Sequence, residues 1–327
     1  MTRSRISRTA AYVAAARALG AREPDVAARN PDYLAERLLG DTARYDLDLP
    51  VIHALAGSYD DAMQDLEVAG LVCAMIVRAR FIDEALERAV AGGAKQLLIL
   101  GAGFDSHACR FESLLRELRV YEVDQPATQA WKRERVAAVV GAPPPNLSYV
   151  AVDFSAEDLG AVLRSHGYDF SQRSFVIMEG VTMYLEESAL RQTLQLLATH
   201  PAGSSVVFDF VSSVMLDMIR ALNPGVLPPQ ARAFAERFLH LTRDEPWLFG
   251  FPFRQERSYL EELGFSVGEV LPVGSDDAVR RYLTRADGTR VGAEIPVRMP
   301  TPPTEAARER LEAMAYKICE VFVPRRH

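Results

Sequence analysis

The run Gln96-Leu97-Leu98-Ile99-Leu100, followed by Gly101-Ala102-Gly103-Phe104-Asp105, decides the fold of this 327-residue chain. Five consecutive residues that are almost all apolar and end in glycine are typical of a central parallel strand buried on both faces. Glycines directly after such a strand let the backbone turn tightly and let a ligand approach without a Cβ in the way. The stretch therefore predicts one unit of an open α/β sheet, in which ligands bind at the carboxyl ends of the strands.

Strand and helix patterns alternate along the rest of the chain. Further strands are predicted at 119–124, 147–153, 174–179, 204–210, 266–272 and 317–323. Helices are predicted at 112–118, 128–140, 158–166, 187–199 and 258–263, with another near 305–315. Such alternation predicts an α/β fold with a doubly wound, mostly parallel seven-stranded sheet.

Residues 1–93 carry no convincing strand pattern. Helices are predicted over 9–19, over 31–39 with Asn30 as the cap, and along a long 3.6-residue pattern that begins near Tyr59 and ends at Gly92-Gly93. We expect a helical cap at 1–93 packed on a core at 94–327, and a proline-punctuated helical lid inserted at 212–250.

Composition excludes several classes of protein. A net charge of −7 argues against a nucleic-acid partner, whose phosphates call for a basic surplus. No apolar run approaches the ~18 residues of a membrane span, and no secretory signal is evident, so we expect a cytoplasmic protein. Cys73, Cys109 and Cys319 have no metal-type spacing, so no metal is expected. A homodimer is left open.

The loop after the first strand favours a methyl donor over a dinucleotide. The third glycine of the dinucleotide fingerprint is replaced by Ser106, and Asp105 would repel a pyrophosphate at the same turn. S-adenosylmethionine has no phosphate and carries a sulfonium cation, which tolerates an acidic neighbour. A nicotinamide-dependent oxidoreductase and a non-catalytic S-adenosylmethionine-binding module remain alternatives.

Acidic residues close the following strands. Asp124 lies about twenty residues beyond the glycine loop, where a carboxylate can accept from ribose hydroxyls, and Glu122 shares its face of the strand. Asp153 beside Phe154 could bind adenine, and Glu179 before Gly180 could contact the donor's amino group or cation. These positions predict one cofactor site at the carboxyl edge of the sheet.

Together these segments resemble the leucine carboxyl methyltransferase-like class I S-adenosylmethionine-dependent methyltransferases, a family that includes bacterial natural-product O-methyltransferases. The matching motifs are Ile6-Ser7-Arg8-Thr9-Ala10, Arg78-Ala79-Arg80-Phe81-Ile82-Asp83, Leu98-Ile99-Leu100-Gly101-Ala102-Gly103-Phe104-Asp105, Tyr121-Glu122-Val123-Asp124-Gln125-Pro126, Val152-Asp153-Phe154 and Glu179-Gly180-Val181-Thr182-Met183-Tyr184-Leu185. The order is that of the family, and the resemblance weakens after about residue 210.

The resemblance implies a role for each matching position. Arg78, with Arg80 as a less favoured substitute, would hold the carboxylate of the donor's methionine part. Gly101 would line that part, Asp124 the ribose, Asp153 and Phe154 the adenine, and Glu179 the amino group. The cofactor-binding set is completed by Ala102, Gly103, Asp105, Gln125 and Gly180, with Arg17 as a covering basic residue of the N-terminal helix. His107 stands where the family often has arginine, which we expect to affect packing more than chemistry.

The acceptor is less well defined. An ionised carboxylate needs no general base, whereas a phenol with a pKa near 10 would benefit from one. Only Tyr184 and His166 are candidate bases by residue type. The sequence therefore favours methyl-ester formation on a small natural product such as a polyketide. A phenolic hydroxyl or a protein C-terminal carboxylate is the alternative.

Aromatic residues of the insertion are candidates for binding that acceptor. Trp247, Phe249, Phe251 and Phe253 alternate with small or apolar residues, and Arg254 follows them. We expect Tyr184, Trp247, Phe249 and Arg254 to contact a planar acceptor. The alternative is that the aromatic side chains pack the insertion onto its own core.

Overall fold

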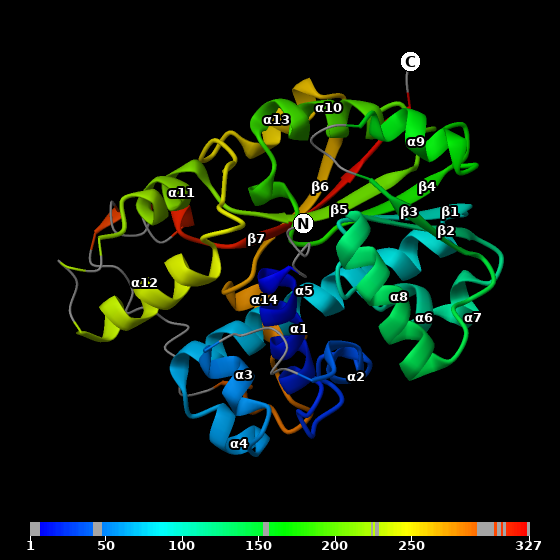
Figure 1. Ribbon diagram of the computed structural model, residues 1–327. Helices are drawn as coiled ribbons and strands as arrows, with labels where there is room; N and C mark the ends of the chain where they lie inside the picture. Colours follow the sequence, from blue (N-terminus) through cyan, green and yellow to red (C-terminus); the bar gives the residue numbers. More distant parts are fainter. Residues whose placement is uncertain are drawn as a thin grey trace, which may run out of the picture.

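A seven-stranded sheet forms the centre of the computed structural model, which describes residues 7–41, 48–152, 157–223, 225, 229–292, 304–305, 309 and 312–325 (Figure 1). The strands are β1 (Gln96–Leu100), β2 (Arg119–Asp124), β3 (Leu147–Ala151), β4 (Ser174–Met178), β5 (Ser205–Phe210), β6 (Ser266–Pro272) and β7 (Lys317–Phe322). The predicted α/β fold, with a mostly parallel seven-stranded sheet, is confirmed.

The strand order β3-β2-β1-β4-β5-β7-β6 places the glycine loop at the point where the winding reverses. β1 pairs in parallel with both β2 and β4, so Leu98 faces Tyr121 on one side and Val176 on the other. Among the strands that the structure describes, only β7 runs antiparallel, between β5 and β6. β7 therefore enters the sheet at the edge where the parallel strands end.

Each face of the sheet buries its own apolar core. Leu97 and Ile99 of β1 belong to one core, and Leu98 and Leu100 to the other, as the two-residue period of a strand requires. The first core lies against α5 (Leu66–Ala91), with α6 (His107–Arg110), α7 (Glu112–Leu115), α8 (Pro126–Val140) and α14 (Asp276–Tyr282) on that face. The other face is covered by α9 (Leu159–Ser165), α10 (Glu187–Leu197) and α13 (Glu256–Glu262).

The N-terminal section is helical, as predicted, but its helices are shorter. It comprises α1 (Arg8–Gly20), α2 (Ala35–Leu39), α3 (Pro50–Ala54) and α4 (Tyr59–Ala62), next to α5. The helix predicted at 31–39 begins only at Ala35, because Asn30 accepts from Asp32 N (2.9 Å) and donates to Met75 O (2.9 Å) instead of capping a helix.

The long helical pattern that begins at Tyr59 is divided in two. Asp65 Oδ1 accepts from Glu67 N (2.8 Å) and Val68 N (3.2 Å), which starts α5 afresh at Leu66. Helices α3, α6 and α14 were not predicted, and most of the helix predicted near 305–315 lies outside the described residues.

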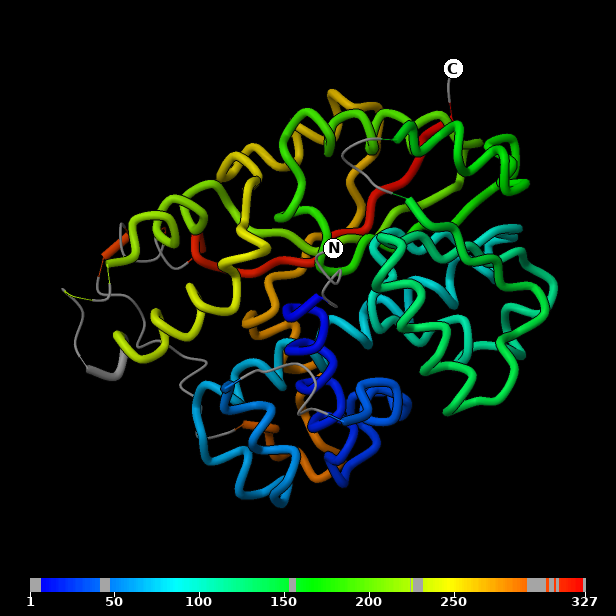
Figure 2. Tube along the Cα trace, in the orientation of Figure 1, coloured from blue at the N-terminus to red at the C-terminus, as the bar shows by residue number. Residues whose placement is uncertain are grey.

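The insertion holds α11 (Ser213–Arg220) and α12 (Pro229–Leu241), which extend beside the sheet as an arm (Figure 2). None of the helices described here is both long and apolar enough to span a membrane. The division of the chain at residue 93 stays a prediction.

Candidate functional site

The glycine loop links the ends of three neighbouring strands. Gly101 has a φ of 66°, and a Cβ there would lie 2.5 Å from Val181 Cγ2, so only glycine fits. Ala102 N donates to Val123 O (3.0 Å), and Gly103 N donates to Asp124 Oδ2 (2.5 Å). The loop is thereby fixed between the carboxyl ends of β2 and β4.

Asp124 and Glu122 of β2 have different partners. The second oxygen of Asp124 accepts from Gln125 N (2.6 Å), and burial raises the pKa of this carboxyl against the effect of its backbone donors. Glu122 lies 2.6 Å from Lys132 Nζ of α8. Burial raises the pKa of Glu122 to about 7, although Lys132 acts in the opposite direction. Glu122 is thus already committed to α8.

Two arginines converge on Glu179 at the end of β4. Arg78 Nη2 lies 2.5 Å from Glu179 Oε1, and Arg17 Nη1 lies 3.2 Å from the same oxygen. Arg17 also donates to Phe104 O (2.8 Å) in the glycine loop. Burial alone would raise the pKa of Glu179, yet the two guanidinium groups hold it below its ordinary value. Glu179 is therefore a buried carboxylate between cations.

His107, at the start of α6 after the glycine loop, lies between two carboxylates. Its Nδ1 is 2.7 Å from Asp105 Oδ2, and its Nε2 is 3.0 Å from Asp83 Oδ1. Burial opposes the charged form, but the two carboxylates raise the pKa of His107 to about 10. His107 is thus an imidazolium at neutral pH. Its role is electrostatic as well as steric, whereas the sequence predicted an effect mainly on packing.

The ion pairs continue into the helical section. Arg110 donates to both oxygens of Asp83 (2.7 and 2.8 Å), and Ser106 donates to Asp32 Oδ1 (2.7 Å). Arg17 Nε lies 3.3 Å from Asp32 Oδ2. These contacts join α1, α5 and the glycine loop in one buried network of alternating charge.

A metal ion is a poor fit for this network. Asp105, His107 and Glu179 offer ligand atoms within 4.8 Å of one another. A metal requires a neutral imidazole and an available carboxylate, whereas His107 is protonated and Glu179 is shared by two arginines. The arrangement fits a charge network better than a metal centre.

Asp209 and Tyr316 were not predicted as site residues from the sequence. Asp209 is the second-to-last residue of β5. Its Oδ1 accepts from Gly180 N (2.6 Å), and its Oδ2 accepts from Arg78 Nη1 (3.2 Å). The Tyr316 hydroxyl accepts from Arg78 Nη1 (2.7 Å) and donates to Asp209 Oδ2. The available signal was an aspartate within the apolar run of the strand Ser205–Phe210.

Glu245, at the end of the insertion, was missed as well. Its Oε2 accepts from Ser7 Oγ (3.0 Å), Thr9 N (3.3 Å) and Thr9 Oγ1 (2.5 Å). The adjoining Ala10 Cβ lies 3.5 Å from where a Cβ on Gly103 would stand. Helix α1 therefore crosses the glycine loop, fastened to the insertion at one end and to Glu179 at the other.

Tyr184 and Trp247 lie where the insertion meets the loop after β4. Leu248 N donates to Met183 O (2.7 Å), which fixes the end of the insertion against η2 (Thr182–Tyr184). Burial raises the pKa of the Tyr184 hydroxyl, while its contacts with Trp247 and Thr9 oppose that effect. Their place near Thr9, in the first turn of α1, keeps both as candidate acceptor contacts.

Two other acceptor candidates already have partners within the fold. Phe249 is only 7% exposed and packs edge-on against Phe251 (5.1 Å between ring centroids) in the core beneath α13, which supports the alternative that the aromatic side chains pack the insertion onto its own core. Alternating aromatic residues do not distinguish a lid from a core. Arg254 is paired on the surface with Glu309 and Glu312 (2.9 Å each), and its acceptor contact stays a prediction.

Arg80 and His166 face away from the site. Arg80 donates to Val26 O (3.1 Å) and Arg29 O (3.3 Å), so it holds a loop of the helical section instead of facing Glu179. His166 caps α9 at the edge where β2 begins, since the next residue, Gly167, accepts from Tyr121 Oη (2.8 Å). His166 as a base is therefore wrong. Asp153 and Phe154 lie outside the described residues.

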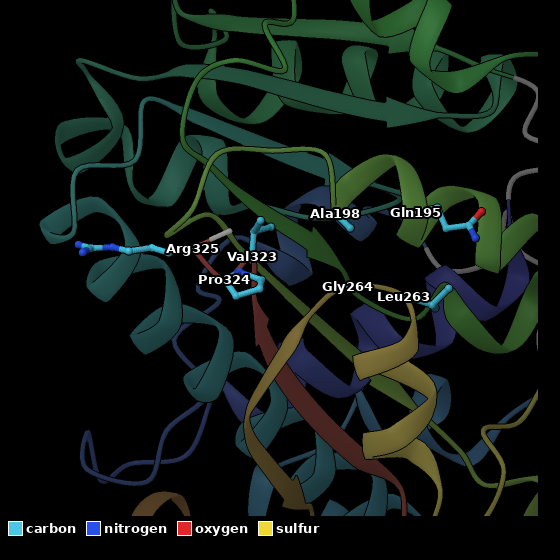
Figure 3. Close-up of a pocket in the computed structure, with 7 residues that line it drawn as sticks. All are labelled: Gln195, Ala198, Leu263, Gly264, Val323, Pro324 and Arg325. Atoms are coloured by element: carbon cyan, nitrogen blue, oxygen red, sulfur yellow. The ribbon is translucent and has the colours of Figure 1, made fainter. Parts of the chain in front are cut away.

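A separate pocket of about 350 Å³ lies on the opposite edge of the sheet (Figure 3). It is lined by Gln195, Ala198, Leu263, Gly264, Val323, Pro324 and Arg325. Val323 N donates to Ser204 O, just before β5 begins, which places this pocket at the amino edge of the parallel strands. Its position separates it from the glycine loop and its charged network.

Comparison with known proteins gives consistent matches. The family model described as leucine carboxyl methyltransferase matches residues 10–198. A Mycobacterium bovis protein named as an S-adenosyl-L-methionine-dependent methyltransferase is 32% identical over 293 residues, 84% of this chain and 88% of its own. The similarly named YktD of Bacillus subtilis is 28% identical over 202 residues, 60% of this chain and 62% of its own. A solved Thermobifida fusca structure described as a methyltransferase covers 94% of this chain and 97% of its own, at 16% identity and a TM-score of 0.49.

Proposed function

The chain belongs to the leucine carboxyl methyltransferase family of S-adenosylmethionine-dependent methyltransferases, and from this membership we propose that it methylates an oxygen atom of a small organic acceptor. The observation that carries the proposal is the convergence of Gly101, Asp124 and Glu179 at the switch point of the sheet. This is where open α/β sheets bind their ligands.

The residues present fit the donor. Arg78 is 3% exposed, and its Nε has no hydrogen-bond partner among the described residues, so a carboxylate there would satisfy a buried donor. Glu179 offers a carboxylate to the donor's ammonium group. The Asp124 carboxylate has roughly four lone-pair sites, and two of them accept from backbone N–H groups. The others can accept from ribose hydroxyls.

When bound, S-adenosylmethionine supplies an activated methyl group on a sulfonium cation. The chain's part is then alignment and exclusion of water, which can supply much of the acceleration for such a displacement. Helix α1 covers the glycine loop, and Glu245 fastens it to the insertion. We infer that the acceptor enters beside Tyr184 and Trp247, between these two segments.

The acceptor group has two candidates. A carboxylate, which would form a methyl ester on a natural product such as a polyketide, needs no base from the chain. The position of Glu245 favours a phenolic hydroxyl as the acceptor. The Glu245 carboxylate is near enough to Tyr184 to raise the pKa of the Tyr184 hydroxyl, so it lies close to the expected acceptor entrance. A carboxylate beside the acceptor would attract a proton but repel a second anion.

One experiment tests the donor and then the acceptor. Calorimetry with S-adenosylhomocysteine and NADH should show binding of the first alone; the reverse result would overturn the assignment. The enzyme is then supplied with methyl-labelled S-adenosylmethionine and 2-hydroxybenzoate, which carries both acceptor groups on one ring. Mild alkali releases labelled methanol from an ester but leaves an aryl ether intact. Donor binding without transfer to any acceptor in a broader panel would favour a non-catalytic binding module.

A further inference from the structure

Asp209 is a charged residue in a place that disfavours charge. It is 1% exposed and lies between Phe208 and Phe210 in a strand that is buried throughout. Burying a carboxylate costs several kcal/mol before its partners offset it, and a well-packed apolar residue is often as stable. Asp209 therefore needs an explanation beyond the packing of the core.

The partners of Asp209 belong to the donor site. One oxygen accepts from Gly180 N (2.6 Å), next to Glu179, and the other accepts from Arg78 Nη1 (3.2 Å). The carbonyl of Asp209 accepts from Thr182 Oγ1 (2.6 Å) in the same loop. Asp209 thus fixes both the arginine and the loop that faces it.

Tyr316 completes the arrangement because β7 runs antiparallel. Lys317 pairs with Phe210, so the preceding residue emerges at the carboxyl edge of the parallel strands. Val273 N donates to Tyr316 O (2.9 Å) and holds the backbone. The Tyr316 hydroxyl then lies between Arg78 Nη1, from which it accepts at 2.7 Å, and Asp209 Oδ2, to which it donates.

These contacts hold both terminal nitrogens of the Arg78 guanidinium group and leave its Nε without a partner in the part of the chain that the structure describes. Nη1 is held by Asp209 and Tyr316, and Nη2 by Glu179, while Nε has no partner among the described residues. We propose that Asp209 and Tyr316 are positioning residues that orient Arg78 toward the methionine carboxylate of the donor. The inference rests on the proposed function and assigns neither residue to the reaction itself.

The test compares two ligands that differ at the methionine end. S-adenosylhomocysteine carries the amino-acid group, whereas 5′-methylthioadenosine shares the adenosine and thioether parts but lacks it. Calorimetry of wild type and Tyr316→Phe should show an approximately tenfold loss of affinity for S-adenosylhomocysteine, as expected for a lost hydrogen bond to a charged group. Affinity for 5′-methylthioadenosine should not change.

Two further variants sharpen the result. Asp209→Asn keeps an oxygen for Gly180 N–H but removes the charge that holds Arg78, so it should show the same selective loss. Tyr282→Phe removes a hydroxyl that donates to Glu84 (2.8 Å) elsewhere in the fold, so it should affect neither ligand. If Asp209→Asn does not fold, Tyr316→Phe alone decides.

Three outcomes overturn the inference. Equal weakening of both ligands by Tyr316→Phe would show that Tyr316 only supports the fold. Unchanged affinities would show that it does not orient Arg78. Failure of the wild-type protein to bind either ligand would overturn the proposed function as well, which separates that failure from the other two.

Discussion

Arg17 Nη1 of helix α1 lies 3.2 Å from Glu179 Oε1 at the end of β4, although 162 positions separate the two residues. This contact makes the first described helix part of the proposed donor site. The same helix is held by Glu245 at its amino end and packs beside Gly103. Donor binding should therefore depend on residues that lie outside the Rossmann-like core.

Gly101→Ala should abolish donor binding. The residue has a positive φ of 66°, and the new Cβ would lie 2.5 Å from Val181 Cγ2. Both effects force the loop out of position, so affinity for S-adenosylhomocysteine should fall at least about a hundredfold. The matched control is Gly274→Ala, where nothing lies within 4 Å of the added Cβ. Calorimetry that gave equal affinities for the two variants would contradict this role.

Asp124→Ala should lower affinity for S-adenosylhomocysteine by about 1–3 kcal/mol, because ribose hydrogen bonds and the contact with Gly103 N are both lost. Asp124→Asn should cost less, since an amide oxygen can still accept from Gly103 N. Calorimetry on the two variants gives the comparison. Unchanged affinity in Asp124→Ala would remove Asp124 from the ribose site.

Glu245→Ala should speed dissociation of S-adenosylhomocysteine by about five- to tenfold. The carboxylate supports the first turn of α1 through Ser7 and Thr9, and losing such a cap costs about 1 kcal/mol. Stopped-flow release of the ligand measures the rate, and amide exchange at residues 9–12 should increase. Glu236→Ala, on an exposed position of α12, is the control. Equal dissociation rates in both variants would show that the contact of Glu245 with Ser7 and Thr9 does not retain the ligand.

The sequence predicted what local patterns encode. Strand β1 matches its prediction at both ends, because five apolar residues followed by glycine carry their own signal. The predicted start of α5, near Tyr59, is too early, because the apolar spacing continues through the break before Asp65, which caps the helix. Local periodicity finds an element but not the cap that bounds it.

Local periodicity could not identify residues whose contacts are with partners far away in the sequence. Asp209 and Arg78 are 131 positions apart, and Tyr316 and Arg78 are 238 apart. Their meeting depends on the antiparallel entry of β7, which no sequence window shows. Phe249 shows a different limit, because an aromatic residue in an insertion suits a ligand pocket and a core equally well.

His107→Gln should destabilise the protein, whereas His107→Arg should preserve more of its stability. The imidazolium lies between Asp105 and Asp83, and removing one member of a buried charged group costs about 3–5 kcal/mol. The folded-state pKa is raised from 6.5 to about 10, so this stabilisation is complete below pH 6.5 and is lost as the pH rises toward 10.

Urea unfolding at pH 6, 8 and 9.5 measures this dependence. The stability gap between wild type and His107→Gln should narrow toward pH 9.5, while His107→Arg should keep its contribution because arginine stays charged. A gap that does not change with pH would show that His107 is neutral in the folded protein.

Glu23→Gln should loosen the attachment of the segment after α14 to the helical section. Glu23 is fully buried and accepts from Arg285 Nε (2.8 Å), Arg285 Nη2 (2.9 Å) and Tyr59 Oη (2.8 Å). Burial alone would raise its pKa, but Arg285 and Tyr59 hold the pKa below the ordinary 4.5. The contribution of Glu23 to stability is therefore complete above pH 4.5 and is lost as the pH falls through the lower, folded-state pKa.

Urea unfolding should show a loss of about 2–3 kcal/mol for Glu23→Gln at pH 7 that shrinks toward pH 3. Glu261→Gln, which removes an exposed partner of Arg257, should cost less than about 0.5 kcal/mol at either pH. A deficit for Glu23→Gln that is equal at pH 7 and pH 3 would mean that packing around the side chain, and not its charge, holds this segment in place.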